Sequence, residues 1–437
     1  MSFTDRYGLA ISTPYASAAA HYRDGMDRSL AGDAGAEEAF AAAVKVDDGF
    51  ALAYISLARA LQFRGAGKEA RVAATRAREL AAGTTARERQ HINAIATAVD
   101  GNPVRALELT REHVAEYPCD ATVASMAMGV YGLIGFSGHR DRNAEQLAFC
   151  EPLAKHYGDD WWFLSMHAFS LNELFRTAEA RVLVERSLAA RERNGHASHC
   201  MAHVLYEEGD VTGGAEFLDR WIVGYEAGAQ LYGHLNWHLA LFELASGHPE
   251  RTLKLFDDVL HPAVNPSPAL GTIADAASLL WRTGIATGEE QRERWPAVAE
   301  LAAKAFPKPS ITFADMHCAL AFAATNDAGH IGAMVDALRE RLAADRVPAG
   351  PVVLALAEGA LAFANGDYAA AVTHMAPYRA DVVRIGGSHA QRDVFEETLL
   401  EAYIRAGQVE EATALLTERL DRRPSLADER RLLALAS

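Results

Sequence analysis

The sequence predicts an all-α fold, a solenoid of stacked helical hairpins. Three observations support this: small and large apolar residues recur at helical spacing, the runs break at glycine and resume, and the layout repeats along the chain. The stretch ALAYISLARALQFRGAGKEARVAATRAREL, from Ala51 to Leu80, shows one unit, with Gly65 between two amphipathic runs. Because a single hairpin cannot bury its apolar stripe alone, we expect neighbouring hairpins to stack around a continuous core.

Turn residues followed five positions later by a small residue mark the units in chain order. The regular units are Gly65 with Ala70, Gly101 with Ala106, Gly209 with Gly214, Gly247 with Thr252, and Gly407 with Ala412. Degenerate units centre near Phe175 with Ala180, near Asn326, and near Gly366 with Ala371. This is a tetratricopeptide-like pattern, and its period of about 34 residues predicts about eleven helix pairs in a right-handed superhelix. We expect residues 1–437 to form a single solenoid.

Two proline-containing segments interrupt the helical pattern. They are Val264–Thr272 and Phe306–Ser310, where paired prolines forbid helix continuation. No alternating β-branched run bounded by Asn-Gly or Asp-Gly turns stands out, so we expect no strands.

Composition and charge limit the classes of partner. The chain has 42 Lys and Arg against 58 Asp and Glu, a net charge of −16, which disfavours binding to nucleic acid or to an anionic membrane surface. The start of the chain lacks a signal-peptide pattern, and no stretch is apolar for long enough to cross a membrane. The four cysteines are far apart, which is typical of reduced thiols. We therefore expect a cytoplasmic protein without nucleic-acid or membrane partners.

A stripe of histidines precedes two of the turn glycines. His196, His199 and His203 lie thirteen, ten and six residues before Gly209, offsets that span roughly 60° of a helix. His234 lies thirteen residues before Gly247, in the place that matches His196, and His238 is shifted toward the helix interface. In such arrays the first helix of each pair lines the concave side. The spacing therefore predicts a polar pocket between neighbouring hairpins, although a single histidine in a helical repeat is more often structural.

Other histidines share parts of this pattern. His91 lies ten residues before Gly101 and so takes the place of His199 in an earlier unit. His113 and His317 are interpreted as structural.

Two kinds of ligand suit the histidine pocket. A metal ion could be held by His199, His203 and Glu207, each one turn from the next, but the well-specified His-Glu-x-x-His motif is missing. We therefore favour a metal-free pocket of neutral imidazoles that binds a small polar or anionic molecule. We predict no metal, and the sequence leaves the cofactor unknown. No nucleophile motif is present, so histidine is the candidate acid or base.

A second group of polar residues lies in the late segment IGGSHAQRD. Ser388 followed three residues later by Gln391 predicts a capping box, which makes His389 the first residue of a helix. A helix start presents free backbone N–H groups, so an anion could bind beside His389 and Arg392.

The segments HASHCMAH, GHLNWH and GGSHAQRD together resemble the tetratricopeptide repeat protein 38 family. The resemblance covers essentially the whole chain and is most specific in the last segment. It implies an all-helical array, and it supplies no catalytic residue to carry over.

Two functional hypotheses follow. In the first, a histidine-lined concave pocket binds a small polar or anionic ligand, with histidine acid and base chemistry on candidates His199, His203 and His389. Its ligand-binding residues are His196, His199, His203, His234, His238, His389 and Arg392. In the second, the chain is an adaptor that binds a peptide in the concave groove. The sequence leaves open the ligand, any reaction, the oligomeric state, and whether His389 shares one pocket with the earlier histidines.

Overall fold

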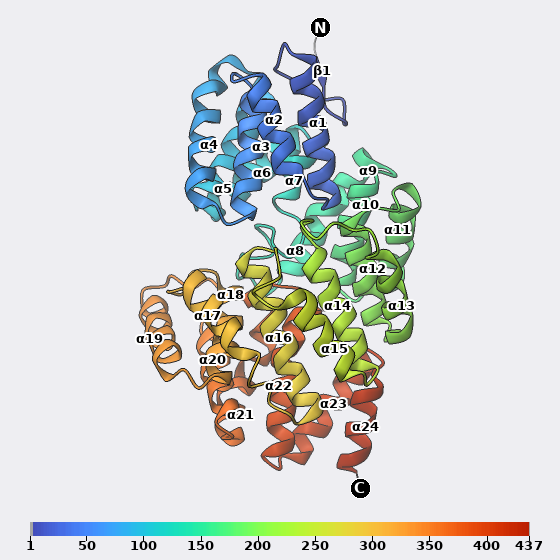
Figure 1. Ribbon diagram of the computed structural model, residues 1–437, viewed down its shortest axis with the longest axis vertical. Coiled ribbons are helices and arrows are strands. Elements are labelled where there is room, and N and C mark those ends of the chain that lie inside the picture. Colours follow the sequence, from blue (N-terminus) through green and yellow to red (C-terminus); the bar gives the residue numbers. More distant parts are fainter. Residues whose placement is uncertain (1–2, 437) are drawn as a thin grey trace.

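The computed structural model describes residues 3–436, and nearly all of its regular structure is helical (Figure 1). The N-terminal part contains α1 (Ala16–Ala31), α2 (Ala36–Val46), α3 (Ala51–Phe63), α4 (Gly67–Leu80), α5 (Ala86–Val99), α6 (Pro103–Glu116), α7 (Ala121–Ser125), α8 (Arg142–Cys150) and α9 (Ala154–Tyr157). The middle contains α10 (Trp161–Asn172), α11 (Thr177–Ala190), α12 (Gly195–Glu207), α13 (Val211–Trp221), α14 (Tyr232–Ala245), α15 (Pro249–Leu255), α16 (Ala269–Thr287) and α17 (Trp295–Ala305). The C-terminal part contains α18 (Thr312–Ala324), α19 (Ala328–Ala343), α20 (Val352–Ala364), α21 (Tyr368–Met375), α22 (His389–Arg405), α23 (Val409–Arg422) and α24 (Leu426–Leu435). Short 3-10 segments span Ala81–Gly83, Glu151–Leu153 and Ala376–Ile385, and a π-helical turn spans Phe256–Leu260.

These helices form the predicted all-α tetratricopeptide-like solenoid. Ten pairs of successive helices pack as hairpins: α1/α2, α3/α4, α5/α6, α10/α11, α12/α13, α14/α15, α16/α17, α18/α19, α20/α21 and α22/α23. The short helices α7, α8 and α9 stand where a further pair would be, which agrees with the expected number of about eleven.

The predicted turns have the geometry that the sequence pattern requires. Gly65, Gly101, Gly209, Gly247, Gly366 and Gly407 all adopt the left-handed conformation. In two degenerate units the same conformation falls on Phe175 (φ 58°) and Asn326 (φ 52°), so the turn survives without glycine. The small residue that follows is needed for close packing: a Cβ on Gly214 would lie 2.4 Å from the Phe242 ring.

One minor expectation is wrong. Phe3–Thr4 (β1) pairs antiparallel with Ala10–Ile11 (β2). Two-residue strands are too short to show an alternating pattern, so the sequence does not reveal them. The two proline segments do interrupt the helices, between the π-helical turn and α16 and between α17 and α18.

The solenoid brings distant segments together. The N-terminal helix α1 touches α12. Helix α22 packs along α16, and the two ribbons lie together in the lower half of Figure 1. Trp281 of α16 donates a hydrogen bond to Thr398 of α22 at 2.9 Å. Within residues 3–436, none of the helices has both the length and the apolarity needed to cross a bilayer. The candidate site lies where α10, α12, α14, α16 and α22 meet.

Candidate metal centre

Two neighbouring helices place four imidazole rings together. Helix α12 carries His199 and His203 one turn apart, and α14 carries His234 and His238 one turn apart. One ring nitrogen from each histidine lies within 4.8 Å of the others, and the Nε2 atoms of His199 and His203 are 2.9 Å apart. Figure 1 shows α12 and α14 side by side in the middle of the molecule. The structure therefore brings together four of the five histidines that the sequence places on these two hairpins.

Aromatic side chains wall the four rings. Phe169 of α10 stacks on His199 at 5.7 Å between centroids and meets His203 edge-on at 5.2 Å. Trp237 stacks on His234 at 5.0 Å. Such packing fixes the ring planes, so the nitrogen atoms are held toward one another.

The rings are almost completely buried, which differs from the expected open groove. His203 and His238 have no exposed surface, whereas 6% of His199 and 11% of the His234 side chain are exposed. The centre therefore approaches solvent at the edge formed by His199 and His234. Burial, followed by repulsion from neighbouring imidazoles, holds the pKa of His199, His203 and His238 well below the ordinary value of 6.5. These three rings are neutral near pH 7 and keep a lone pair for a ligand.

Several polar atoms of the cluster have no hydrogen-bond partner. They are both ring nitrogens of His238 and Nδ1 of His203. Leaving a buried polar atom unsatisfied costs about 1–3 kcal/mol. A species bound by one nitrogen of each ring would give one of the two His238 nitrogens a partner.

A carboxylate on the next hairpin orients one of the rings. Asp275 of α16 accepts a hydrogen bond from Nδ1 of His234 at 2.9 Å. With its Nδ1–H bound in this way, His234 presents Nε2 as the lone-pair nitrogen. Metal-ligating histidines almost always have such a partner on the second ring nitrogen.

The donor set fits a transition-metal ion. Imidazole nitrogens bind Zn²⁺ at about 2.0–2.1 Å, which places the nitrogens of a tetrahedral site about 3.3 Å apart. The 2.9 Å separation and the 4.8 Å limit bracket that value, so small rotations of the rings would suffice. His199, His203, His234 and His238 are the residues that could hold the ion.

The late segment reaches the same region from α22. Ser388 caps this helix, accepts from the backbone N–H of Gln391, and forms the predicted capping box. Nδ1 of His389 lies 2.6 Å from Glu207 of α12, and Glu173 accepts from the backbone N–H of His389 at 2.9 Å. The start of α22 therefore contacts the last residue of α12, Glu207, one helical turn after His203.

Two glycines let this segment approach closely. A Cβ on Gly386 would lie 2.6 Å from Phe136, and one on Gly387 would lie 2.3 Å from Phe313. Arg142, buried below the loop, donates to the Gly387 carbonyl. Only glycine leaves room for this contact.

Some residues predicted for the site lie outside the cluster. His196 packs against the end of α1, where it bonds the Ser29 backbone, and burial lowers its pKa to about 4. Glu207 bonds His389, and the geometry groups the candidates His199 and His203 with His234 and His238 rather than with Glu207. Arg392 is buried beside Glu173, 3.3 Å away. His238, expected nearer the helix interface, lies in the cluster, with its ring centre 5.2 Å from that of His199 and 4.5 Å from that of His203.

Sequence analysis missed Asp275 and Phe169. Asp275 lies within the apolar run TIADAASLLWR, and an acid inside an apolar helix is the signal that could have found it. Phe169 carries no such signal, since it reads as an ordinary core residue.

A second histidine cluster lies in the N-terminal part. His91 of α5 and His113 of α6 both bond Asp120, at 2.9 Å and 3.0 Å, and Arg87 donates to the same carboxylate at 2.6 Å. Burial alone would raise the pKa of Asp120, but the charges and hydrogen bonds of these three side chains hold it well below the usual range. The expectation that His91 faces the groove like His199 is therefore wrong.

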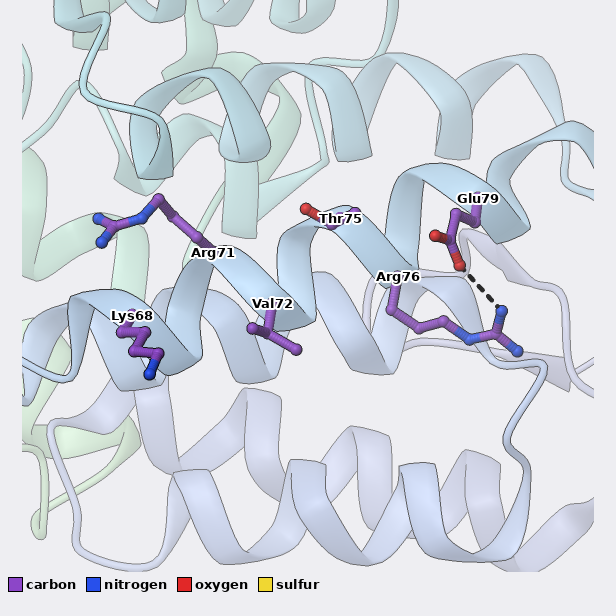
Figure 2. A pocket seen from close by; sticks show the side chains of 6 residues that line it. All are labelled: Lys68, Arg71, Val72, Thr75, Arg76 and Glu79. Atoms are coloured by element: carbon purple, nitrogen blue, oxygen red, sulfur yellow. Dashed lines mark hydrogen bonds and ion pairs between the residues drawn. The ribbon is translucent and has the colours of Figure 1, made fainter.

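Two surface hollows lie elsewhere. Figure 2 shows one along the outer face of α4, lined by Lys68, Arg71, Val72, Thr75, Arg76 and Glu79. Arg76 donates to Glu79 there at 3.1 Å. The other is lined by Gln90, Asn93, Leu109, Glu112 and Glu116. Neither hollow includes a residue of the four-histidine cluster.

Comparison with known proteins adds nothing to the chemistry of the site. No family model matches the chain. Yeast Tom70 is similar over 96% of this chain and 94% of its own, at 13% identity and a TM-score of 0.35. Human IFIT1, as a dimer with m7Gppp-AAAA, is similar over 88% and 90%, at 14% identity and a TM-score of 0.43. Cut9–Hcn1 of the APC/C is similar over 87% and 76%, at 13% identity and a TM-score of 0.36. The site is therefore interpreted from its own geometry.

Proposed function

We propose that this chain is a helical-repeat metalloprotein in which His199, His203, His234 and His238 bind a divalent transition-metal ion. The observation that carries the proposal is the convergence of one nitrogen from each ring within 4.8 Å, in a buried place. Neutral imidazoles suit zinc, copper, iron and nickel, and the carboxylate of Asp275 supplies the outer hydrogen bond.

This proposal changes the ligand that the sequence favours. A metal-free pocket would need open space between the imidazoles, whereas these rings pack at centroid distances of 4.5–5.2 Å. The acid and base roles expected for His199 and His203 give way to ligation, because a bound ion occupies the lone pair that a base would use. His389 stays a candidate acid or base, since Glu207 orients its ring.

Three further expectations stay proposals. The first is membership of the tetratricopeptide repeat protein 38 family, which rests on the segments HASHCMAH, GHLNWH and GGSHAQRD. The second is that residues 1–437 act as one array. The third is a cytoplasmic location without nucleic-acid partners.

Elemental analysis of the purified protein tests the function directly. We expect close to one equivalent of a transition metal per chain, lost on treatment with a chelator and restored by zinc, cobalt or nickel. Restoring the metal should raise the unfolding temperature, because an ion that binds only the folded chain stabilises it. Protein that carries no metal and shows no thermal shift with any of the three ions would leave the peptide adaptor as the better hypothesis.

A further inference from the structure

Helix α24 leaves an apolar stripe uncovered. It packs against α23, and Figure 1 shows the two helices beside each other at the lower end of the molecule. Leu426 and Leu433 of α24 are 61% and 72% exposed, and they are the only exposed leucines among residues 3–436. Two leucines seven residues apart on one helix therefore face solvent, whereas the other leucines of the described chain are at least partly buried.

Opposite charges lie between the two leucines on the same stripe. Glu429 and Arg430 are both exposed. At about 100° per residue, all four side chains fall within about 100° of the helix circumference. The stripe therefore has an apolar residue at each end and one acidic and one basic residue in its middle.

The ion pairs of α24 are made on its opposite side. Asp428 is 3% exposed and accepts a hydrogen bond from Arg419 of α23 at 2.9 Å. Arg431 lies 3.8 Å from the carboxylate of Asp428. Within residues 3–436, neither Glu429 nor Arg430 forms an ion pair. Both charges are therefore available to a partner.

The order of the four residues fits a second copy of the same helix. When two identical helices pack antiparallel about a two-fold axis between Glu429 and Arg430, each Leu426 lies opposite Leu433 of the other copy. The same axis places each Glu429 opposite Arg430 of the other copy, because both pairs share one midpoint along the helix. Apolar residues seven apart are also typical of helices that pair along their length. The stripe is thus complementary to itself in both apolar contact and charge.

The local charge permits such pairing, although the whole chain has a net charge of −16. Residues 409–436, which include α23 and α24, contain five arginines and six acidic residues. This part of the surface is therefore nearly neutral. Repulsion between more distant acidic residues of two copies is screened over about 8 Å at physiological salt.

We propose that this face of α24 joins two copies of the chain in a two-fold symmetric dimer, with the two α24 helices antiparallel. Because α24 has ten residues, the contact is at the small end of specific interfaces, and the dimer forms in a concentration-dependent way. The four-histidine cluster is on α12 and α14, so the dimer does not depend on metal binding.

Sedimentation velocity of the full chain, from about 1 to 200 μM, tests the dimer over the range expected for a weak interface. The average mass should rise from that of one chain toward that of two. Leu433→Glu should weaken association by at least about tenfold, because it places a charge in the apolar contact. Val104→Glu on α6 is the matched control, since Val104 is also 72% exposed, and it should leave association unchanged. A single chain at every concentration, or association that Leu433→Glu leaves intact, would overturn the proposal and indicate a different occupant for this face.

Reciprocal charge changes test the antiparallel arrangement. Glu429→Arg and Arg430→Glu should each weaken association by about threefold to tenfold, because each places like charges opposite one another twice. The double variant should regain the native affinity, and an equimolar mixture of the two single variants should associate more tightly than either alone. Unfolding temperatures show whether each variant keeps its fold. If neither the double variant nor the mixture associates better than the single variants, the proposed dimer is wrong.

Discussion

The protein buries two histidine clusters, and they differ in the groups that the imidazoles contact. In the N-terminal cluster, His91 and His113 share the carboxylate of Asp120, and Arg87 balances its charge. In the central cluster, four imidazoles face one another, and one carboxylate, Asp275, bonds from outside. In the first cluster, each histidine is paired with the shared carboxylate. In the second, only His234 is paired with a carboxylate.

The two clusters also differ in how many buried ring nitrogens lack a hydrogen-bond partner. The N-terminal cluster leaves one buried nitrogen free, Nε2 of His91, on the side of the ring away from the carboxylate. The central cluster leaves three nitrogens of His203 and His238 free. The central cluster therefore has more buried nitrogens without a partner than the N-terminal cluster has.

The largest difference should appear in metal binding. Replacing His203 or His238 with Ala removes one of four ligands, and we expect metal affinity to fall by at least about a hundredfold, more than loss of an outer-shell partner costs. His91→Ala is the matched control, since it removes a buried histidine of the other cluster. Competition with a coloured chelator measures both. If His91→Ala loses as much metal affinity as the variants of the central cluster, the two clusters do not differ in metal binding.

A substitution in the N-terminal cluster should instead lower folding stability. Asp120→Asn leaves Arg87 buried without its carboxylate, and breaking such a pair costs about 3–5 kcal/mol. Urea denaturation measures the loss, and metal affinity should stay at the native level. An unchanged midpoint would show that the N-terminal cluster does not hold its helices together.

A smaller effect is expected from the partner of His234. Asp275→Asn should weaken metal binding by about tenfold to a hundredfold, since the ring loses its orienting carboxylate while all four ligands remain. The cobalt spectrum should keep its shape, which separates positioning from ligation. Asp315→Asn is the control, because Asp315 is another buried carboxylate but bonds the backbone of Ser310. Equal losses in the two variants would contradict a positioning role.

The two clusters should also affect the pH dependence of folding stability in different pH ranges. In the metal-free chain, His199, His203 and His238 have lowered pKa values, so below about pH 6.5 the unfolded chain takes up protons that the folded chain refuses. The free energy of unfolding should therefore decrease as the pH decreases below about 6.5, by up to about 1.4 kcal/mol per pH unit for each histidine. The pKa of Asp120 is also lowered, but its contribution lasts until the pH falls below the ordinary range of a carboxyl.

Urea midpoints measured between about pH 7.5 and 5.5 test this slope, and His238→Gln should reduce it by about a sixth, because His167, His196 and His317 also have lowered pKa values and one of six such histidines is removed. A slope that the variant leaves intact would place the titrating groups elsewhere.

The local features of the fold were predictable because they depend on near neighbours in the chain. Glycine at a hairpin turn and a small residue five positions later act within one unit, and both predictions hold at Gly209 and Gly214. The capping box of Ser388 and Gln391 is likewise a contact between residues three apart. Even the pairing of His203 with His199 follows from helical spacing.

What the sequence by itself determined is the hairpin array, its turn residues and the placing of histidines on one stripe of two adjoining first helices. Only the tertiary structure decided which histidines belong together, because His91 and His199 occupy equivalent places in their units yet meet different neighbours. A carboxylate 29 residues away in the chain reaches His91, whereas His199 faces three other imidazoles. The physical reason is that a side chain's charge and ligation state depend on every helix packed against it, and repeat spacing describes only one of those helices.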